Sequence, residues 1–289
     1  MDADILVASG RRYTRELADI VQNSAPHLRW IQTTAVGIDP FKHHGIPNGV
    51  IMTNSAGLKG RTVGEHGFAL LLGWYHQLPA MERNRQRREW NDDLIRKSVG
   101  SVEGETLLVV GYGSIGREIA RKAKAFDMRV IALTRSGDGD GPADEIRSIG
   151  DLDTILPECD VVALSLPLSA ETHHLMSTEQ FRAMKTSSIL VNVGRGLVVD
   201  QNALIKALTK NEIAGAALDV FETEPLPSDD ALWDFPNVMI SPHVGGAAGR
   251  IYAKFGELVS ENIRRFRAGE DLLNVVSMGA REATVPAWN

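Results

Sequence analysis

The chain has 289 residues, of which 43% are hydrophobic and 24% are charged, and it contains a single cysteine. This composition is typical of a globular protein with room for two modest domains, and it excludes collagen-like, disulfide-stabilised and disordered chains. The 37 acidic residues outnumber the 31 lysines and arginines, and no basic stripe is present, so we expect no nucleic-acid partner.

We also expect no membrane segment and a cytoplasmic location. The N-terminus, Met1-Asp2-Ala3-Asp4, is acidic, whereas a secretory signal begins with basic residues. The most apolar stretch, residues 68–74, is far shorter than the ~20 residues that span a bilayer. The lone Cys159 precedes an apolar run, where we interpret it as a buried thiol in a reducing compartment.

The predicted elements begin with two short apolar strands, Ile5–Ala8 and Trp30–Thr33, and a weaker third at residues 50–53. Residues 60–88 then have the composition of long helices, with an apolar first half and a strongly charged second half. We interpret the charged half as a solvated helix face.

Six further strands are predicted in the middle of the chain, with helices between most of them. They cover residues 106–110, 129–133, 161–166, 188–193, 214–219 and 238–241. Buried strands that alternate with amphipathic helices are typical of βαβ units, so we expect an α/β fold with doubly wound parallel sheets. A last amphipathic helix is predicted at residues 250–267, and we expect it to complete the small N-terminal region.

A glycine-rich loop follows the first of these central strands. Gly111, Gly113 and Gly116 form the pattern G-x-G-x-x-G, with Ser114 and Ile115 between the last two, and a helix signal begins directly after it. A strand, such a loop and a helix are the arrangement that binds dinucleotides. The first glycine allows a tight turn, the second lets backbone approach the pyrophosphate, and the third lets the helix pack on the strand. Unpaired N–H groups at the helix N-terminus then face the anion.

The next strand ends at Thr134-Arg135-Ser136, where an NAD-binding protein usually has an acidic residue for the ribose hydroxyls. No acid stands there, and the guanidinium of Arg135 can pair with the 2′-phosphate that distinguishes NADP. Asp138 and Asp140 follow in a second glycine-rich loop, and they oppose this pairing if the loop folds back. We therefore expect NADP(H) to be preferred, with NAD(H) also able to bind.

Three polar residues, Arg195, Glu224 and His243, each follow a different predicted strand. Because the carboxyl ends of parallel strands meet at one edge of a sheet, we expect them to lie near the dinucleotide loop. Singly, they are explained as a surface ion pair, a solvated carboxylate and a core imidazole. Together, a guanidinium that clamps a carboxylate and an imidazole that titrates near neutrality suit hydride transfer to a carbonyl beside a carboxylate.

In these motifs the chain resembles the D-isomer-specific 2-hydroxyacid dehydrogenase family over nearly its whole length. The resemblance is carried by the glycine-rich loop with its preceding strand, by LPLSAET at residues 166–172, by VNVGRG at 191–196, by DVFETEP at 219–225 and by SPH at 241–243. It implies that Arg195 binds the substrate carboxylate, that Glu224 orients His243, and that His243 is the acid/base. It also implies that Asp219 contacts the nicotinamide side of the cofactor.

The resemblance extends to the two binding surfaces. The sequence TAVGID at residues 34–39 is similar to the family's substrate loop, so the backbone N–H groups of Ala35, Val36 and Gly37 are implied to hold the substrate with Arg195 and His243. We expect the glycines beside Arg195 to admit the nicotinamide ring. The implied cofactor-binding residues are Gly111, Gly113, Ser114, Ile115, Gly116, Thr134, Arg135, Ser136, Leu166, Pro167, Thr172, Val193, Gly194, Asp219, His243 and Gly245.

The family also implies two Rossmann-like or flavodoxin-like domains. The substrate domain would comprise residues 1–56 and 246–289, and the dinucleotide-binding domain residues 57–245. We expect the substrate domain to be shortened at its N-terminus, since family members usually have another strand and helix before the segment at Ile5–Ala8. The helices at residues 60–88 resemble the arm through which family members form homodimers.

The implied activity is that of an NAD(P)-dependent oxidoreductase that reduces a small 2-oxo acid, such as glyoxylate or hydroxypyruvate, to the D-2-hydroxy acid. One alternative is a dinucleotide-sensing regulator without turnover, although a regulator is expected to lack one of the three polar residues. Another is a formate dehydrogenase, although those enzymes carry an amide where Glu224 stands. We expect no metal at the adjacent pairs His43-His44 and His173-His174, because neighbours in a strand point to opposite faces.

Overall fold

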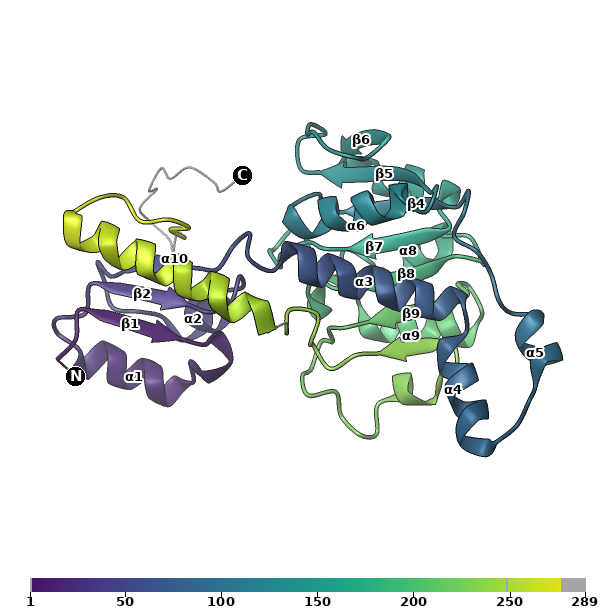
Figure 1. Ribbon diagram of the computed structural model, residues 1–289, viewed down its shortest axis with the longest axis horizontal. Coiled ribbons are helices and arrows are strands. Elements are labelled where there is room, and N and C mark those ends of the chain that lie inside the picture. The colour runs from purple at the N-terminus through teal and green to yellow at the C-terminus, as the bar shows by residue number, and fades with distance from the viewer. Residues whose placement is uncertain (1, 248, 277–289) are drawn as a thin grey trace. The chain divides into compact units, whose positions relative to one another are not determined.

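The computed structural model of the protein describes residues 2–247 and 249–276. The chain forms two compact units, of which unit 1 contains residues 1–59 and 248–289 and unit 2 contains residues 60–247 (Figure 1). Each unit is built on a sheet in which the strands are parallel, as predicted for an α/β fold. Among the helices of the described residues, none combines the length and the apolar character of a membrane span.

Unit 1 has a three-stranded sheet in the order β1-β2-β3. Its elements are β1 (Ile5–Ala8), α1 (Arg15–Ser24), β2 (Trp30–Thr33), α2 (Asp39–His44), β3 (Ile51–Thr53) and α10 (Gly249–Ala268). Successive side chains of β2 face opposite sides of the sheet. Ile31 lies in a core with Phe41 of α2, whereas Trp30 packs on Phe266 of α10 with ring centroids 5.7 Å apart. Both faces of the small sheet are therefore covered by helices.

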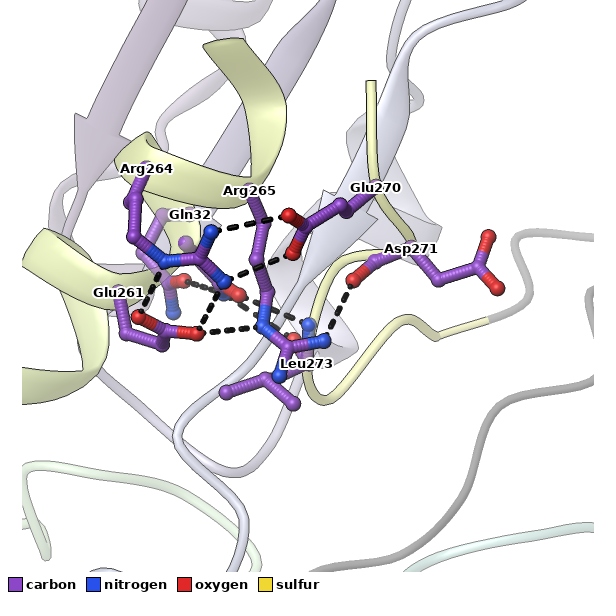
Figure 2. A network of polar contacts seen from close by, with 8 residues as sticks. Gln32, Glu261, Arg264, Arg265, Glu270, Asp271 and Leu273 are labelled. Atoms are coloured by element: carbon purple, nitrogen blue, oxygen red, sulfur yellow. Dashed lines mark hydrogen bonds and ion pairs between the residues drawn. The ribbon is translucent and has the colours of Figure 1, made fainter. Parts of the chain in front are cut away.

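The last turns of α10 carry a network of ion pairs (Figure 2). Arg264 binds Glu261 at 2.9 Å and Glu270 at 2.7 Å, and Arg265 binds Glu261 at 2.8 Å. Hydrogen bonds from the two guanidinium groups lower the pKa of Glu261 to about 2. The network fastens the end of the helix to the segment that follows it.

A neutral pair lies beneath these charges. Asn262 is fully buried, and its Nδ2 donates to Gln32 Oε1 at 3.2 Å and to the carbonyl oxygen of Leu273 at 3.1 Å. The amide of Leu273 donates back to Asn262 Oδ1 at 2.8 Å. The chain after α10 then bonds beside β3, where Val276 N donates to Met52 O at 2.8 Å.

Unit 2 has a seven-stranded sheet in the order β10-β9-β8-β7-β4-β5-β6. The strands are β4 (Thr106–Val110), β5 (Arg129–Thr134), β6 (Glu145–Ser148), β7 (Val161–Leu164), β8 (Ile189–Asn192), β9 (Gly215–Leu218) and β10 (Val238–Ile240). The chain starts at β4, runs outward to β6, returns to β7 and continues to the other edge. This is the strand order of a Rossmann fold, with its switch point between β4 and β7.

Helices cover both faces of this sheet (Figure 1). They are α3 (Gly60–Tyr75), α6 (Ser114–Lys124), α7 (Leu152–Ile155), α8 (Thr178–Ala183) and α9 (Gln201–Thr209), whereas α4 (Leu78–Arg87), which has no buried residue, and α5 (Asp92–Arg96) extend away from the sheet. Leu107 and Val109 of β4 pack in a core with α3 and α6, whereas Leu108 and Val110 pack in a core with α7, α8 and α9. A strand buried on both faces is a continuous apolar run, which is why these strands could be predicted.

Two features of unit 2 differ from the predicted elements. Strand β6 was not predicted, because its sequence Glu-Ile-Arg-Ser is polar and half-buried, as edge strands often are. The helical region at residues 60–88 is divided at Gln77, which has a φ of 54° and precedes the first turn of α4 with Pro79. A left-handed residue cannot continue a right-handed helix, so α3 ends before it.

Candidate active site

The three polar residues predicted to act together follow three neighbouring strands of unit 2. Arg195 comes after β8, Glu224 after β9 and His243 after β10. These strands are parallel and adjacent in the sheet, so their loops leave the same edge. The glycine-rich loop after β4 leaves that edge too.

His243 and Glu224 form a hydrogen-bonded pair. The distance between His243 Nδ1 and Glu224 Oε2 is 2.7 Å, and the two side chains are 37% and 33% exposed. The other carboxylate oxygen, Oε1, accepts a hydrogen bond from the amide of Phe221 at 3.2 Å. Because an ionised carboxylate only accepts, Nδ1 carries the hydrogen of the pair, and a proton can enter or leave the ring at Nε2.

The backbone around Arg195 is fixed by Asn192, the last residue of β8. Asn192 is buried, its Nδ2 donates to the carbonyl oxygen of Arg195 at 3.1 Å, and its Oδ1 accepts from Gly194 N at 3.0 Å. The guanidinium of Arg195 donates to the carbonyl oxygen of Gly194 at 2.8 Å. The half-buried arginine therefore projects from a rigid turn.

The glycines beside Arg195 are required by close contacts within the protein. A Cβ at Gly196 would lie 1.9 Å from the carbonyl carbon of Phe221, and a Cβ at Gly194 would lie 2.9 Å from the carbonyl oxygen of Leu166. The space at these Cβ positions is occupied by protein backbone, and the approach of a nicotinamide ring to the same glycines stays a prediction. Gly196 thereby brings the loop of Arg195 into contact with the loop that carries Glu224.

The glycine-rich loop has the geometry that pyrophosphate binding requires. Gly111 has a φ of +91°, which suits glycine, and a Cβ at Gly116 would lie 2.2 Å from the carbonyl oxygen of Gly111. Gly113 has open space around its missing Cβ and is the N-cap of α6 without a side-chain cap. The amides of the first turn of α6, beginning at Ser114 and Ile115, are therefore available to an anion, so the loop fits a dinucleotide.

Three further predicted cofactor residues, Leu166, Thr172 and Val193, follow β7 or β8. Leu166 lies against Gly111, since a Cβ there would be 2.7 Å from Leu166 Cδ2. Thr172 Oγ1 donates to the carbonyl oxygen of Pro167 at 2.8 Å and closes the turn after β7. Val193 is buried, and its Cγ1 would be 3.1 Å from a Cβ at Gly67 of α3, so its side chain belongs to the core.

The end of β5 presents Arg135 and Ser136 as exposed side chains. Thr134 Oγ1 accepts from Gly137 N at 2.9 Å and donates to the carbonyl oxygen of Asp138 at 3.0 Å, so its hydroxyl is used by the turn. Asp140 forms an ion pair with Arg117. One of the two acids that could oppose a 2′-phosphate is therefore already bound to a cation.

A different acid, which was not predicted, lies near Arg135. The pKa of Glu171 is lowered by a hydrogen bond from Ser169 and, to a smaller extent, by the positive charge of Arg135. Glu171 follows β7 and Arg135 follows β5, so their proximity depends on the strand order. Glu171 thus brings a negative charge within electrostatic range of the guanidinium.

The predicted substrate loop, Ala35 to Gly37, lies in unit 1 after β2. Asn54 Nδ2 donates to the carbonyl oxygen of Val36 at 2.8 Å, and the amide of Ala35 donates to Thr33 Oγ1 at 3.2 Å. Within the part of the chain that the structure describes, no acceptor bonds to the amides of Val36 and Gly37. Two of the three predicted amides are therefore open to a ligand, and the third is used by the turn.

The histidine pairs do not lie in strands, so the reason for excluding a metal there was wrong. His43 and His44 end α2 with ring centroids 4.7 Å apart, and His173 and His174 stack at 4.0 Å in the loop after β7. His174 Nε2 lies 2.9 Å from Glu222 Oε1. Across residues 2–247 and 249–276, no group of three or more histidine, cysteine or acidic residues is arranged to hold a metal ion.

The chain is similar to a known protein family and to individual known proteins. Residues 68–245 match the family model for the D-isomer specific 2-hydroxyacid dehydrogenase, NAD binding domain. The chain is 36% identical over 272 residues to a glyoxylate reductase of Korarchaeum cryptofilum, a match that covers 93% of this chain and 82% of that protein.

Two solved structures show the same architecture. A D-isomer specific 2-hydroxyacid dehydrogenase family protein of Aeromonas salmonicida has a TM-score of 0.85 and 33% identity, over 96% of this chain and 86% of that one. An NADPH-dependent glyoxylate/hydroxypyruvate reductase of Sinorhizobium meliloti, in complex with NADP and sulfate, has a TM-score of 0.82 and 26% identity, over 95% of this chain and 85% of that one.

Proposed function

The chain belongs to the D-isomer-specific 2-hydroxyacid dehydrogenase family, and from this premise we propose that it reduces a small 2-oxo acid to the D-2-hydroxy acid with NADPH. The observation that carries the proposal is the 2.7 Å bond between His243 Nδ1 and Glu224 Oε2, on the strand ends that also present Arg195. Glyoxylate and hydroxypyruvate are the substrates we favour, since relatives that cover most of this chain are glyoxylate or glyoxylate/hydroxypyruvate reductases.

The chemistry follows from the roles that these side chains can take. The guanidinium of Arg195 binds the substrate carboxylate through two parallel hydrogen bonds and stays charged throughout. NADPH, when bound at the glycine-rich loop, would supply the hydride to the carbonyl carbon. His243 donates the proton on Nε2 to the carbonyl oxygen, while Nδ1–H stays bonded to Glu224 and keeps the ring from rotating. We also propose that the open amides of Val36 and Gly37 take part in substrate binding, as the family resemblance implies.

We further propose that NADPH is preferred over NADH. No acid follows β5 directly, Arg135 is exposed there, and Asp140 is held by Arg117. Glu171 near Arg135 opposes a 2′-phosphate and limits the preference. We expect Arg135→Ala to lower the ratio of kcat/KM for NADPH to that for NADH by about tenfold or more, because a charge-assisted pair is lost. An unchanged ratio would show that Arg135 is only a surface cation.

We also propose a homodimer formed through α3 and α4. Helix α4 has no buried residue in the single chain, Leu78 and Met81 on it are 52% and 41% exposed, and Trp90 beyond it is 91% exposed. Apolar groups at this exposure are typical of a surface that a second copy covers. Sedimentation equilibrium that gives the 31.5 kDa monomer at micromolar concentration would contradict this.

The experiment that tests the function is a panel of 2-oxo acids assayed with both cofactors. NADPH and NADH oxidation is followed at 340 nm with glyoxylate, hydroxypyruvate, pyruvate and larger 2-oxo acids, and the hydroxypyruvate product is separated on a chiral column. We expect turnover with at least one small 2-oxo acid and a D-product. A protein that binds dinucleotide but turns over no 2-oxo acid would instead be a regulator, and an L-product would contradict the stereochemical part.

A further inference from the structure

The turn that carries His243 is unusual in its backbone. His243 has a φ of 54°, in the left-handed region that residues other than glycine seldom adopt. The carboxylate of Asp219, which is 2% exposed, holds this turn. Its Oδ1 accepts from Ser241 Oγ at 2.6 Å and from Val244 N at 2.9 Å, and its Oδ2 accepts from Gly245 N at 3.0 Å. The direction of the His243 ring therefore depends on where this carboxylate sits.

A histidine of α3, His66, reaches the same carboxylate. Its Nε2 lies 2.8 Å from Ser241 Oγ and 3.3 Å from Asp219 Oδ1, and its side chain is 25% exposed. Ser241 has one hydroxyl hydrogen, which it donates to the carboxylate of Asp219. The hydrogen bond between His66 and Ser241 therefore requires that Nε2 of His66 carries a hydrogen and donates it.

The ring of His66 also packs against the turn. A Cβ at Gly245 would lie 3.1 Å from His66 Cδ2 and 2.9 Å from Asp219 Oδ2. The imidazole, the carboxylate and the backbone of the turn are thus in direct contact, with no room for a side chain between them. A displacement of the imidazole would be transmitted to the carboxylate and then to the turn.

The helix that carries His66 is itself fixed against the dinucleotide helix α6. A Cβ at Gly60 would lie 2.9 Å from Ser114 Cβ, and a Cβ at Gly64 would lie 2.7 Å from Glu118 Cβ. These glycines are spaced one helical turn apart and let the two backbones approach closely. Helix α3 therefore spans the region between the loop proposed to bind the cofactor and the turn of His243.

We infer that His66 is a positioning residue for the reaction: it donates from Nε2 to the Ser241 and Asp219 pair and so fixes the turn that directs His243 toward Glu224. The inference rests on the proposed function for its effect on turnover. Its structural part, the ordering of the turn at residues 243–245, can be measured without turnover.

The first test compares two variants that differ in one donor. His66→Gln keeps an N–H group near the position of Nε2, whereas His66→Met has a similar length and no donor. His76→Met is the control, because His76 lies just beyond the same helix and is exposed. We expect His66→Met to lower kcat by roughly 10- to 100-fold with KM for NADPH nearly unchanged, and His66→Gln to retain most of kcat.

A double variant separates a positioning role from a loss of structure. If His66 acts through His243, His66→Met should lower the residual rate of a His243→Ala protein by less than about twofold. A further loss equal to that seen in the wild-type background would overturn the inference, since the two residues would then act independently.

The second test needs no substrate. Hydrogen–deuterium exchange of the segment at residues 241–247 reports the amides of Val244 and Gly245, which donate to Asp219. We expect exchange there to become about tenfold faster in His66→Met and to stay as in the wild type in His66→Gln. Unchanged exchange in His66→Met overturns the inference whatever the activity, and so does faster exchange with full kcat. A wild type that reduces no 2-oxo acid would count against the proposed function alone, because the exchange result still decides the role of His66 in the turn.

Discussion

The loop at residues 33–37 of unit 1 and the turn at residues 241–245 of unit 2 are held in opposite ways. Behind the first, the buried groups are neutral: Gln32 Nε2 donates to the carbonyl oxygen of Asn54 at 3.2 Å, and Thr53 Oγ1 donates to Gln32 Oε1 at 2.7 Å. Behind the second stands the carboxylate of Asp219, with Ser241 as one of its donors at 2.6 Å. Both sets are hydrogen-bonded, as buried polar groups must be, but only one carries charge.

The difference matches what each loop is proposed to meet. A loop that offers amides to a substrate carboxylate is better backed by neutral groups, because a buried negative charge would repel the ligand. A turn that carries a proton-donating histidine is compatible with negative charge behind it, because that charge attracts the imidazolium. A charge introduced behind the loop of unit 1 should therefore destabilise that loop, and loss of the charge behind the turn of unit 2 should destabilise that turn.

The largest effect is expected where a charge enters the neutral network. Gln32 Nε2 donates to the carbonyl oxygens of Thr33 and Asn54, and in Gln32→Glu a carboxylate oxygen would face both of them. We expect the free energy of unfolding to fall by about 3–5 kcal/mol at pH 8, measured by urea denaturation. The loss should shrink at pH 5, because the protonated acid can donate again.

Gln22→Glu is the matched control, since Gln22 Nε2 also donates to two carbonyl oxygens, those of His44 at 3.0 Å and Gly45 at 3.4 Å, but this side chain is exposed on α1 of the same unit. We expect it to change stability by less than about 0.5 kcal/mol. Equal losses in the two variants would show that the neutral character of the network around Gln32 is of no importance.

A smaller effect is expected from the opposite exchange, Asp219→Asn. Whichever way the amide is turned, its NH2 group faces the amide of either Val244 or Gly245, and one backbone donor loses its acceptor. We expect a loss of about 1–3 kcal/mol in the free energy of unfolding. The exposed Asp229→Asn serves as the control, and an Asp219→Asn protein as stable as this control would contradict the role of the carboxylate in the turn.

A second carboxyl group, Glu105, sharpens the contrast because its neighbour is another carboxylate. Burial, and then the neighbouring carboxylate of Asp160, raise its pKa from 4.5 to about 7, although Lys185 opposes the shift. Burial would also raise the pKa of Asp160, but the hydrogen bond from Lys185 Nζ, at 2.7 Å, contributes to lowering it. Asp160 therefore holds the charge and Glu105 the proton.

A raised pKa in the folded protein means that stability falls as the pH rises from about 4.5 to about 7. We expect Glu105→Gln to remove this part of the pH dependence and to be more stable than the wild type by about 1 kcal/mol at pH 8, after allowance for solvent screening. Urea denaturation at pH 5 and pH 8 measures it. If the wild type and the variant lose the same free energy of unfolding between pH 5 and pH 8, Glu105 does not cause this pH dependence.

Local patterns were enough to predict the dinucleotide loop and the strands of unit 2 other than β6. The central strands are apolar runs because both faces are buried, and the spacing of Gly111, Gly113 and Gly116 follows from a tight turn and a close helix contact. The positions of Arg195, Glu224 and His243 at strand ends could be predicted for the same reason. Family resemblance assigned their roles.

The hydrogen bonds that hold the loops in place could not be predicted, because they join residues that are far apart in sequence. Asn262 and Gln32 are 230 positions apart, and His66 and Ser241 are 175 positions apart. A lone amide or imidazole in a helix carries no local signal of its partner. The contact of Gly196 with the backbone of Phe221 could not be predicted for the same reason, since Phe221 follows a different strand.

The most direct test of the proposed reaction, in which His243 is the proton donor, is the turnover of His243→Ala measured together with its dinucleotide binding. With the 2-oxo acid that the wild type reduces fastest, we expect kcat to fall by about 100- to 10,000-fold, while the dissociation constant for NADPH stays within about twofold. This result would show that His243, held by Glu224 at 2.7 Å, supplies the proton and is not needed for NADPH binding. A variant that keeps the wild-type kcat, or one that loses NADPH binding together with activity, would contradict the account.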